Sequence, residues 1–180
     1  MKPIGPLMRE HRLIEKMLRC FEGEIKKINE QQKVDPLFID AAVDFIRTYA
    51  DRVHHGKEEE ILFRDLIKKQ LSPDHARIMD ELVADHKYAR KSVGMLVDAK
   101  ERYLKGEENT VQEVVVLLRE LAHFYPGHIE KEDKHFFYPC LEYFTKEEQD
   151  QMLAEFYEFD RKMIHEKYEK VVNQIEAQSL

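Results

Sequence analysis

Apolar residues recur every three or four positions through almost the whole sequence, and this spacing is the strongest constraint on its fold. In the segment from about Leu7 to Glu30 they form a single face of a helix. Six glycines and six prolines fall mostly between such segments, and the alternation that is typical of strands is nearly absent. The pattern therefore predicts an all-α protein made of long amphipathic helices.

Local start and stop signals divide the sequence into five helices. Asp35-Pro36 and Ser72-Pro73 each place a capping side chain before a proline at the first turn. The segments Thr110 to Glu113 and Thr145 to Glu148 have the spacing of capping boxes, and Gly106 is placed to end the third helix. We expect helices over about 7–30, 36–70 and 73–105, from 110 until Pro139 stops or kinks the chain, and from 145 to about 178.

Four long helices joined by short links are typical of an up-down antiparallel four-helix bundle. We therefore predict a single domain over residues 1–180, with the bundle at about 5–141 and an additional C-terminal helix at about 145–178. No shift in composition and no low-complexity segment marks a second domain. A chain of 180 residues is long enough to bury a substantial core.

Composition and charge restrict the class of partner. The formal net charge is −7, which disfavours nucleic acid because phosphate binding needs a basic face. No apolar run approaches the roughly 20 residues of a membrane span, and the N-terminus lacks an apolar signal core. The two cysteines, Cys20 and Cys140, are expected to be buried thiols in a reducing compartment. We expect a cytoplasmic protein that binds no nucleic acid and no membrane, and its oligomeric state stays open.

Nine histidines are the unusual part of the composition, and two of them stand in a repeated pattern. His128 and Glu132 are four residues apart, which places them on one face of the fourth helix, near the centre of its apolar stripe. His54 and Glu58 repeat this spacing on the second helix, within a longer echo of histidine, lysine, glutamate and phenylalanine at the same offsets. A buried carboxylate is costly unless it is paired or binds a metal. One such pair alone would indicate a buried hydrogen bond, whereas two favour a metal site.

The second helix leaves the register of its pair ambiguous. His55 and Glu59 have the same spacing one position later. The sequence echo and the apolar face of the preceding turns both favour His54 with Glu58. In that register we expect His55 to face outward or to orient a ligand from behind.

His11 on the first helix and His86 on the third complete the set, so that each bundle helix offers one inward histidine. Imidazole and carboxylate ligands suit iron, manganese or zinc, and bundle cores are a known place for paired-metal carboxylate sites. Two metals would each take two histidines, and both glutamates would bridge them. From the ligands alone, a hydrolytic dizinc site stays open as well. The predicted metal ligands are His11, His54, Glu58, His86, His128 and Glu132.

The order of these motifs resembles the hemerythrin-like, or HHE cation-binding, family. The resemblance is carried by His11 in REHRLIEK, His54–Glu58 in HHGKEEEILF, His86 in ADHKYAR and His128–Glu132 in HIEKEDKHFFYP. It implies an up-down four-helix bundle that holds a non-haem di-iron centre. By this resemblance the two glutamates bridge the irons and the four histidines are terminal ligands.

The sequence departs from the oxygen-carrying members of that family at two places. Those proteins have a fifth histidine one turn from its neighbour on the third helix, where this sequence has Leu82 and Arg90. Their last carboxylate stands five residues after the histidine of the fourth helix, which here would be Asp133. Reversible oxygen carriage is therefore not assumed.

The resemblance implies two iron ions, with an oxo or hydroxo bridge, that bind or react with oxygen, peroxide or nitric oxide. Manganese and zinc are less favoured, and enzymatic turnover of peroxide or nitric oxide stays open. The alternatives are an iron store or donor for iron–sulfur cluster repair, and a helical interaction module whose histidines are satisfied core groups. Repair relatives carry a cysteine-containing N-terminal segment that this sequence lacks, so we expect small-ligand chemistry.

Overall fold

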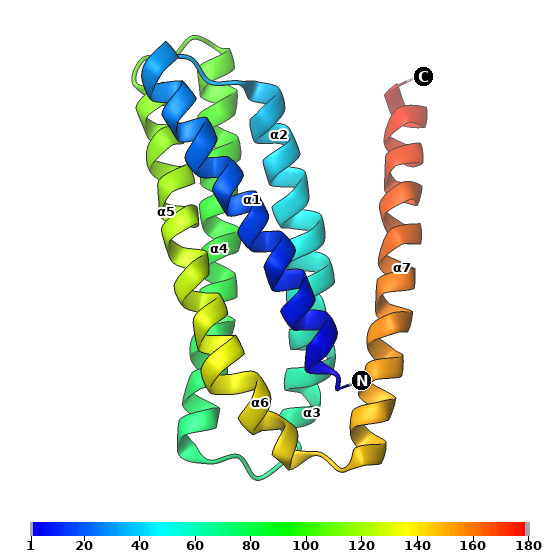
Figure 1. The fold of residues 1–180 in the computed structure, drawn as a ribbon. Helices are drawn as coiled ribbons and strands as arrows, with labels where there is room; N and C mark the ends of the chain where they lie inside the picture. Colours follow the sequence, from blue (N-terminus) through cyan, green and yellow to red (C-terminus); the bar gives the residue numbers. More distant parts are fainter. Residues whose placement is uncertain (1, 179–180) are drawn as a thin grey trace.

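A computed structural model describes the backbone of residues 2–178, with side chains as far as residue 165 and at positions 167 and 169. The regular structure of this part of the chain is entirely helical, which confirms the all-α prediction. Consecutive long helices run in alternating directions, and α7 stands beside the others (Figure 1). Within residues 2–178, no helix combines the length and the apolar character that crossing a membrane requires.

The helical segments follow one another with few interruptions. In chain order they are α1 (Ile4–Gln31), α2 (Pro36–Asp44), η1 (Phe45–His55), η2 (Glu58–Phe63), α3 (Arg64–Leu66), α4 (Pro73–Leu104), α5 (Thr110–Glu130), η3 (Lys131–Phe136), α6 (Phe137–Cys140), η4 (Leu141–Tyr143) and α7 (Lys146–Gln178). Segments α2 to α3 form one continuous helix, and α5 to α6 form another. Inside these two helices, η1, η2 and η3 are π-helical, with wider turns than an α-helix.

Most of the predicted helix ends have the expected capping bonds. Asp35 caps α2 and Ser72 caps α4 by accepting hydrogen bonds from backbone N–H groups of the first turn. Thr145 and Glu148 each bond the backbone N–H of the other at the start of α7, which confirms that capping box. Gly106 has the left-handed backbone conformation (φ 79°) just after α4, as a helix-ending glycine should.

The capping box predicted at Thr110 is wrong. Thr110 is already the first helical residue of α5, and its hydroxyl donates to the carbonyl oxygen of Glu107. Asn109 precedes it in the left-handed conformation (φ 64°) and makes no side-chain cap. Glu113 pairs with Arg102 at the end of α4 instead. A tertiary ion pair and a loop hydrogen bond therefore replace the expected local pair.

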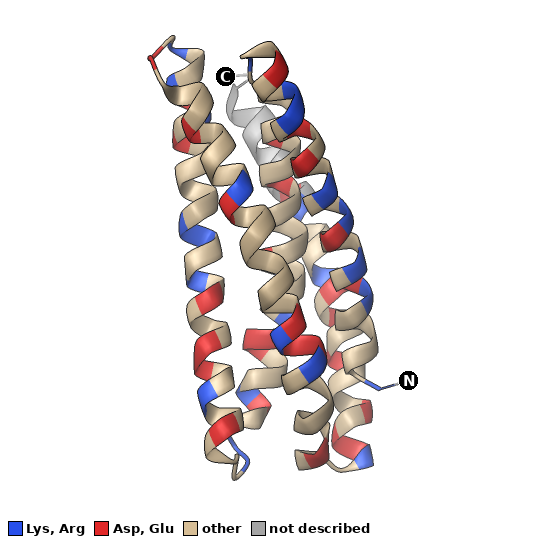
Figure 2. Cartoon of the chain, turned by 60° about the vertical axis from the view of Figure 1, so that its left-hand side comes forward, with Lys and Arg blue, Asp and Glu red and all other residues tan. Residues whose placement is uncertain are grey.

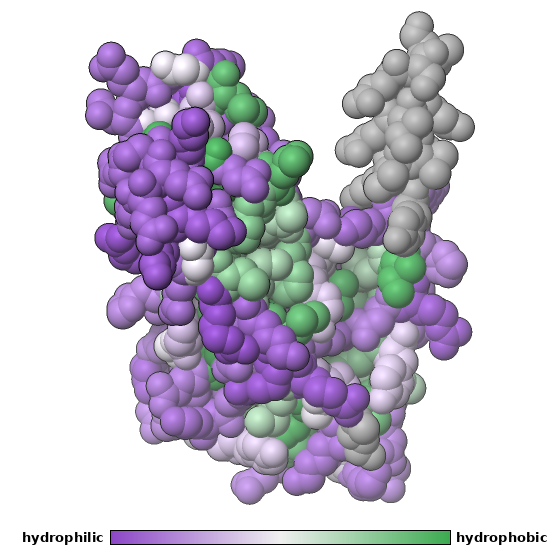
Figure 3. Space-filling model, turned by 45° about the horizontal axis from the view of Figure 1, so that its top comes forward, coloured by the Kyte–Doolittle hydropathy of each residue, from purple (hydrophilic) through white to green (hydrophobic). Residues whose placement is uncertain are grey.

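Two apolar clusters fill the interior, with a layer of buried polar side chains between them. On the first helix, Leu7 belongs to one cluster and Ile14 to the other, and the buried side chain of His11 lies between them in the polar layer. On the second helix, Ala50 and Ile61 mark the same two levels. Lysine and arginine alternate with aspartate and glutamate along the outside (Figure 2), and apolar side chains reach the surface along the middle of one face (Figure 3).

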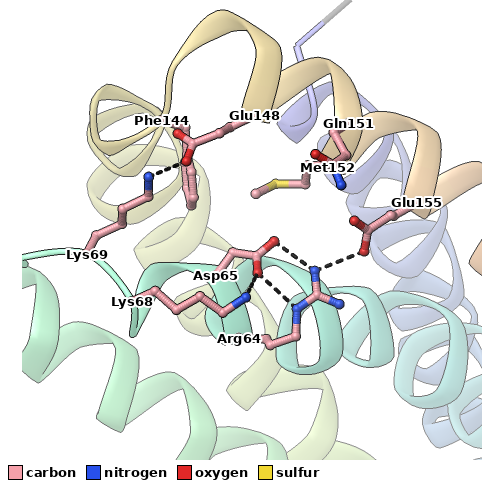
Figure 4. Close-up of a pocket in the computed structure, with 9 residues that line it drawn as sticks. All are labelled: Arg64, Asp65, Lys68, Lys69, Phe144, Glu148, Gln151, Met152 and Glu155. Atoms are coloured by element: carbon pink, nitrogen blue, oxygen red, sulfur yellow. Dashed lines mark hydrogen bonds and ion pairs between the residues drawn. The ribbon is translucent and has the colours of Figure 1, made fainter.

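Helix α7 packs on the second long helix through buried Met152 and Phe156. Farther along, the ring of Phe159 lies so close to Gly56 that an added Cβ there would be 2.8 Å from it. Near the start of α7, Arg64 pairs with Glu155 across a cavity of about 440 Å³ (Figure 4). These contacts hold the first half of α7 against the bundle.

The expectation that both thiols are buried is right for Cys140 and wrong for Cys20. Cys140 is completely buried, and burial raises the pKa of its thiol to about 12. Cys20 lies on the outer face of α1 and is exposed, although Phe21 beside it belongs to the core.

A thiol reagent at neutral pH is therefore expected to modify Cys20 of the folded protein and to leave Cys140 unmodified, because the thiolate is the reactive form. The measurement is the amount of thionitrobenzoate released by Ellman's reagent, before and after denaturation. The expected result is about one thiol in the folded chain and about two in denaturant. Release of both equivalents from the folded protein would contradict this burial.

Candidate metal centre

Side chains from all four long bundle helices meet in the polar layer. The structure buries every predicted ligand there, with exposed fractions of 3% or less. These residues are His11, His54, Glu58, His86, His128 and Glu132. They come from α1, η1, η2, α4, α5 and η3, respectively.

The structure adds His55, which is only 1% exposed, so of the two roles expected for it the outward-facing one is wrong. The cause is the π-helical segment η1, because its wider turn brings successive side chains closer together around the helix axis. His54 and His55 consequently both point into the bundle. Glu58 is fully buried in the layer, whereas Glu59 is partly exposed at its edge.

The buried ligand atoms fall into two groups, in each of which the atoms lie within 4.8 Å of one another. One group contains His11, His54, Glu58 and Glu132, and the other contains His55, His86 and His128. Each group is compact enough to hold one metal ion. We call them the two-histidine position and the three-histidine position.

The carboxylate of Glu58 lies between the two positions. One of its oxygens is 3.5 Å from Nε2 of His54, and the other is 3.4 Å from Nε2 of His86. Glu132 lies the same way, 3.0 Å from Nε2 of His11 and 3.3 Å from Nε2 of His128. Each carboxylate thus directs one oxygen to each position, which is the placement that a bridging ligand needs.

Several polar atoms of this layer are buried without a hydrogen-bond partner. They are Nε2 of His55, His86 and His128, and all four carboxylate oxygens of Glu58 and Glu132. Such atoms are rare in folded proteins because each one costs free energy. In addition, Nε2 of His11 and Nε2 of His54 face each other at 2.8 Å. This donor set fits a pair of metal ions, which would satisfy all of these atoms at once.

A carboxylate stands behind each of the five imidazoles. The Nδ1-to-oxygen pairs are His11–Asp133 at 2.8 Å, His54–Glu10 at 3.0 Å, His55–Asp51 at 3.2 Å, His86–Glu59 at 2.7 Å and His128–Asp85 at 3.2 Å. When Nδ1 donates to a carboxylate, Nε2 is left free for a metal, and such partners orient most metal-bound histidines. Helix periodicity did not predict these partners, although four of the five acids are chain neighbours of a predicted ligand.

The sequence echo corresponds to an approximate two-fold repetition in the structure. Lys57 pairs with the carboxylate behind His54, and Lys131 pairs with the one behind His128. The two phenylalanines also match, since Phe63 stacks on His86 at 6.1 Å and Phe137 stacks on His11 at 5.6 Å. The first two helices and the next two helices thus build related halves of one site.

A family model, the hemerythrin HHE cation-binding domain, matches residues 2–139. The chain belongs to this family. The match confirms the resemblance and covers the whole polar layer and the four helices that form it. Comparisons with curated proteins and with solved structures found no match. Together, hemerythrin-family membership and the buried histidine and glutamate groups indicate a metal-binding protein.

The charges in this hemerythrin-family centre are closely coupled. Burial lowers the pKa of His11, but its close contacts with the carboxylates of Asp133 and Glu132 outweigh burial and raise that pKa to about 10. In the same way, contacts with three glutamates raise the pKa of His86 to about 11. Burial is the main reason that the pKa of His55 lies well below its usual range, and the charges of the neighbouring imidazoles lower it further. Protons and metal ions thus compete for the same ring nitrogens.

A cavity of about 300 Å³ extends from the surface to the three-histidine position. It is lined by Ile46, Arg47, Asp51, Arg52, His55, Ala89, Arg90, Val93 and Tyr125. Tyr125 is buried, and its ring lies 6.5 Å from that of His55. Its hydroxyl is a buried polar atom without a hydrogen-bond partner.

The remaining histidines do not contribute to either group of ligand atoms. His123, His135 and His165 are exposed. His75 is partly buried near the start of α4, where its Nδ1 lies 2.8 Å from the hydroxyl of Tyr143.

Proposed function

We propose that this chain is a non-haem di-iron protein of the hemerythrin type that binds or reacts with oxygen, peroxide or nitric oxide. Its centre would lie in an up-down four-helix bundle, with α7 as an additional helix. The observation that carries the proposal is the placement of Glu58 and Glu132, each with one unpartnered oxygen toward each group of imidazoles. When bound, the irons would supply redox chemistry and a coordination position for a small ligand.

The ligand count distinguishes the two irons. With both glutamates shared, the two-histidine position has four protein ligands and the three-histidine position has five, now including His55. An iron that prefers six ligands would therefore have more vacant positions beside His11 and His54. We assign binding of the small ligand to the two-histidine position.

The test is the metal content and the optical spectrum of protein from iron-replete cells, before and after anaerobic reduction and exposure to air. We expect about two irons per chain, as in other paired-metal bundles. Charge-transfer bands should bleach on reduction and return in air. Zinc in both positions, or no metal, would contradict the proposal. Turnover of peroxide or nitric oxide beyond one ligand per centre would then separate an enzyme from a carrier or a sensor.

Replacing His55 with alanine is expected to remove about one of the two metals, because it deletes a ligand of the three-histidine position alone. His123→Ala, at an exposed position, is the control and should keep both metals. Metal per chain after desalting is the measurement. A His55→Ala protein with full occupancy and an unchanged spectrum would show that His55 is not a ligand.

A further inference from the structure

We propose that α7 belongs to the outer shell of the metal centre, meaning the residues that contact the metal ligands, directly or through one another, and not the metals. In this shell, Asp160 and Lys57 position the ligand His54. The inference rests on the proposed function, since it needs a metal at His54. It goes beyond the family match, because that match ends at residue 139 and α7 begins at Lys146.

A continuous chain of polar contacts joins α7 to the two-histidine position. Nδ1 of His54 lies 3.0 Å from one carboxylate oxygen of Glu10. The other oxygen of Glu10 accepts a hydrogen bond from the Lys57 ammonium. The same ammonium donates to Asp160 of α7 at 2.7 Å. Every link from the metal ligand to α7 is therefore a direct contact between charged or polar groups.

Helix α7 contributes directly to the burial of Lys57. The side chain of Lys57 has no exposed surface, and its ammonium lies 6.0 Å from the centre of the Phe156 ring. The close approach of Phe159 to Gly56 brings α7 against this turn. A buried ammonium is stable only when its charge is compensated, and here Glu10 and Asp160 compensate it together.

The other half of the centre provides an internal comparison. Lys131 pairs with Asp85 at 2.8 Å, and Asp85 stands behind His128. Lys131 is 28% exposed, however, and its second partner is Glu81 of α4 at 3.5 Å. Lys131 is therefore partly exposed to solvent and has Glu81 of α4 as its second partner, whereas Lys57 is buried and has Asp160 of α7. An effect of α7 on the centre should accordingly appear at the two-histidine position and not at the three-histidine position.

Loss of the Asp160 charge is expected to weaken the two-histidine position for two reasons. First, it removes one negative charge from the surroundings of a bound cation. Second, it leaves Lys57 with Glu10 as its remaining carboxylate, so Lys57 competes more strongly with His54 for that carboxylate. Outer-shell changes typically cost about 10–100-fold in metal affinity. Asp160 acts through two other side chains, so we expect the low end, about tenfold.

The experiment measures metal release from the full chain loaded with two equivalents of Co²⁺, after addition of excess EDTA, by following the cobalt absorption bands. The variant His54→Ala should lack the release phase of the two-histidine position, and its absence there identifies that phase in the unmodified protein. In Asp160→Asn we expect this phase to be about tenfold faster and the other phase to be unchanged. Asp160→Glu, which keeps the carboxylate, should restore most of the slow release.

Glu155→Gln is the matched control. Glu155 is also on α7, is also 35% exposed and also pairs with a cation of the second helix, Arg64, at 2.9 Å (Figure 4). It removes the same charge from the same helix without touching the chain of contacts to His54. Its release phases should match those of the unmodified protein. The iron-loaded proteins give a second measurement, since the reduction potential should rise in Asp160→Asn and not in Glu155→Gln.

Three results would overturn the inference. Release from Asp160→Asn at the unmodified rate would show that Asp160 has no part in positioning His54, while the proposed metal centre would stand. Equal acceleration in Glu155→Gln would show that α7 acts through packing alone. An unmodified chain that takes up neither cobalt nor iron would overturn the proposed function together with this inference.

Discussion

Replacing Glu132 with alanine is expected to remove most of the metal from both positions, whereas removal of one histidine should empty only one. The reason is that the two oxygens of Glu132 face His11 on one side and His128 on the other. We expect a loss of affinity larger than the roughly 10–100-fold typical of outer-shell changes. Metal per chain, measured by plasma emission after purification from iron-replete cells, tests this. Glu58→Ala should behave in the same way.

Glu130→Ala is the control for that experiment. Glu130 ends α5 two residues before Glu132, its side chain is 56% exposed, and it pairs with Lys134 on the surface. Its removal changes the charge of the same helix without changing the polar layer, so the variant should keep both metals. Full iron occupancy in Glu132→Ala and in Glu58→Ala would exclude the bridging role of both carboxylates.

Removing the metals is expected to lower the melting temperature by about 10 °C. A ligand present at about 1,000 times its Kd stabilises the folded state by about 4 kcal/mol, and each kcal/mol moves the Tm of a chain of this size by about 2–4 °C. The physical reason is the set of seven buried ring nitrogens and carboxylate oxygens that have no partner without a metal. Thermal unfolding followed by circular dichroism, with and without chelator, is the measurement, and restored metal should restore the Tm.

The size of this shift should depend on pH. In the metal-free protein the pKa of His11 is about 10 and that of His86 is about 11, both above their ordinary value of 6.5. Protonation of these rings therefore stabilises the metal-free fold fully below about pH 6.5, and this stabilisation is lost as the pH rises toward 10. Metal binding releases the same protons and becomes tighter as the pH rises. The Tm difference should thus grow between pH 6.5 and pH 9. A chelator that leaves the Tm unchanged throughout would contradict a metal centre in this layer.

Helix positions and the inward histidine and glutamate residues were predictable because they depend on short-range periodicity. A four-residue spacing places two side chains on one helix face whatever the neighbouring helices do. The capping signals at Asp35, Ser72 and Thr145 are equally local, and the structure has all three. The six predicted ligands therefore lie together in the structure, and all of them fall within the residues that the family model matches.

Tertiary structure decided the features that periodicity does not report. His55 points inward because η1 is π-helical, and an α-helical count places it away from the centre. Glu113 pairs with Arg102 across a loop, so the local signal at Thr110 fails.

The outer shell depends most on contacts between distant parts of the chain. Asp133 meets His11 across 122 positions, and Asp160 meets Lys57 across 103. Helix periodicity shows which face of a helix is buried, but not which charged group of another helix will lie against it. Lysine is usually a surface residue, but burial and long-range pairing in the folded chain enclose Lys57 between Glu10 and Asp160.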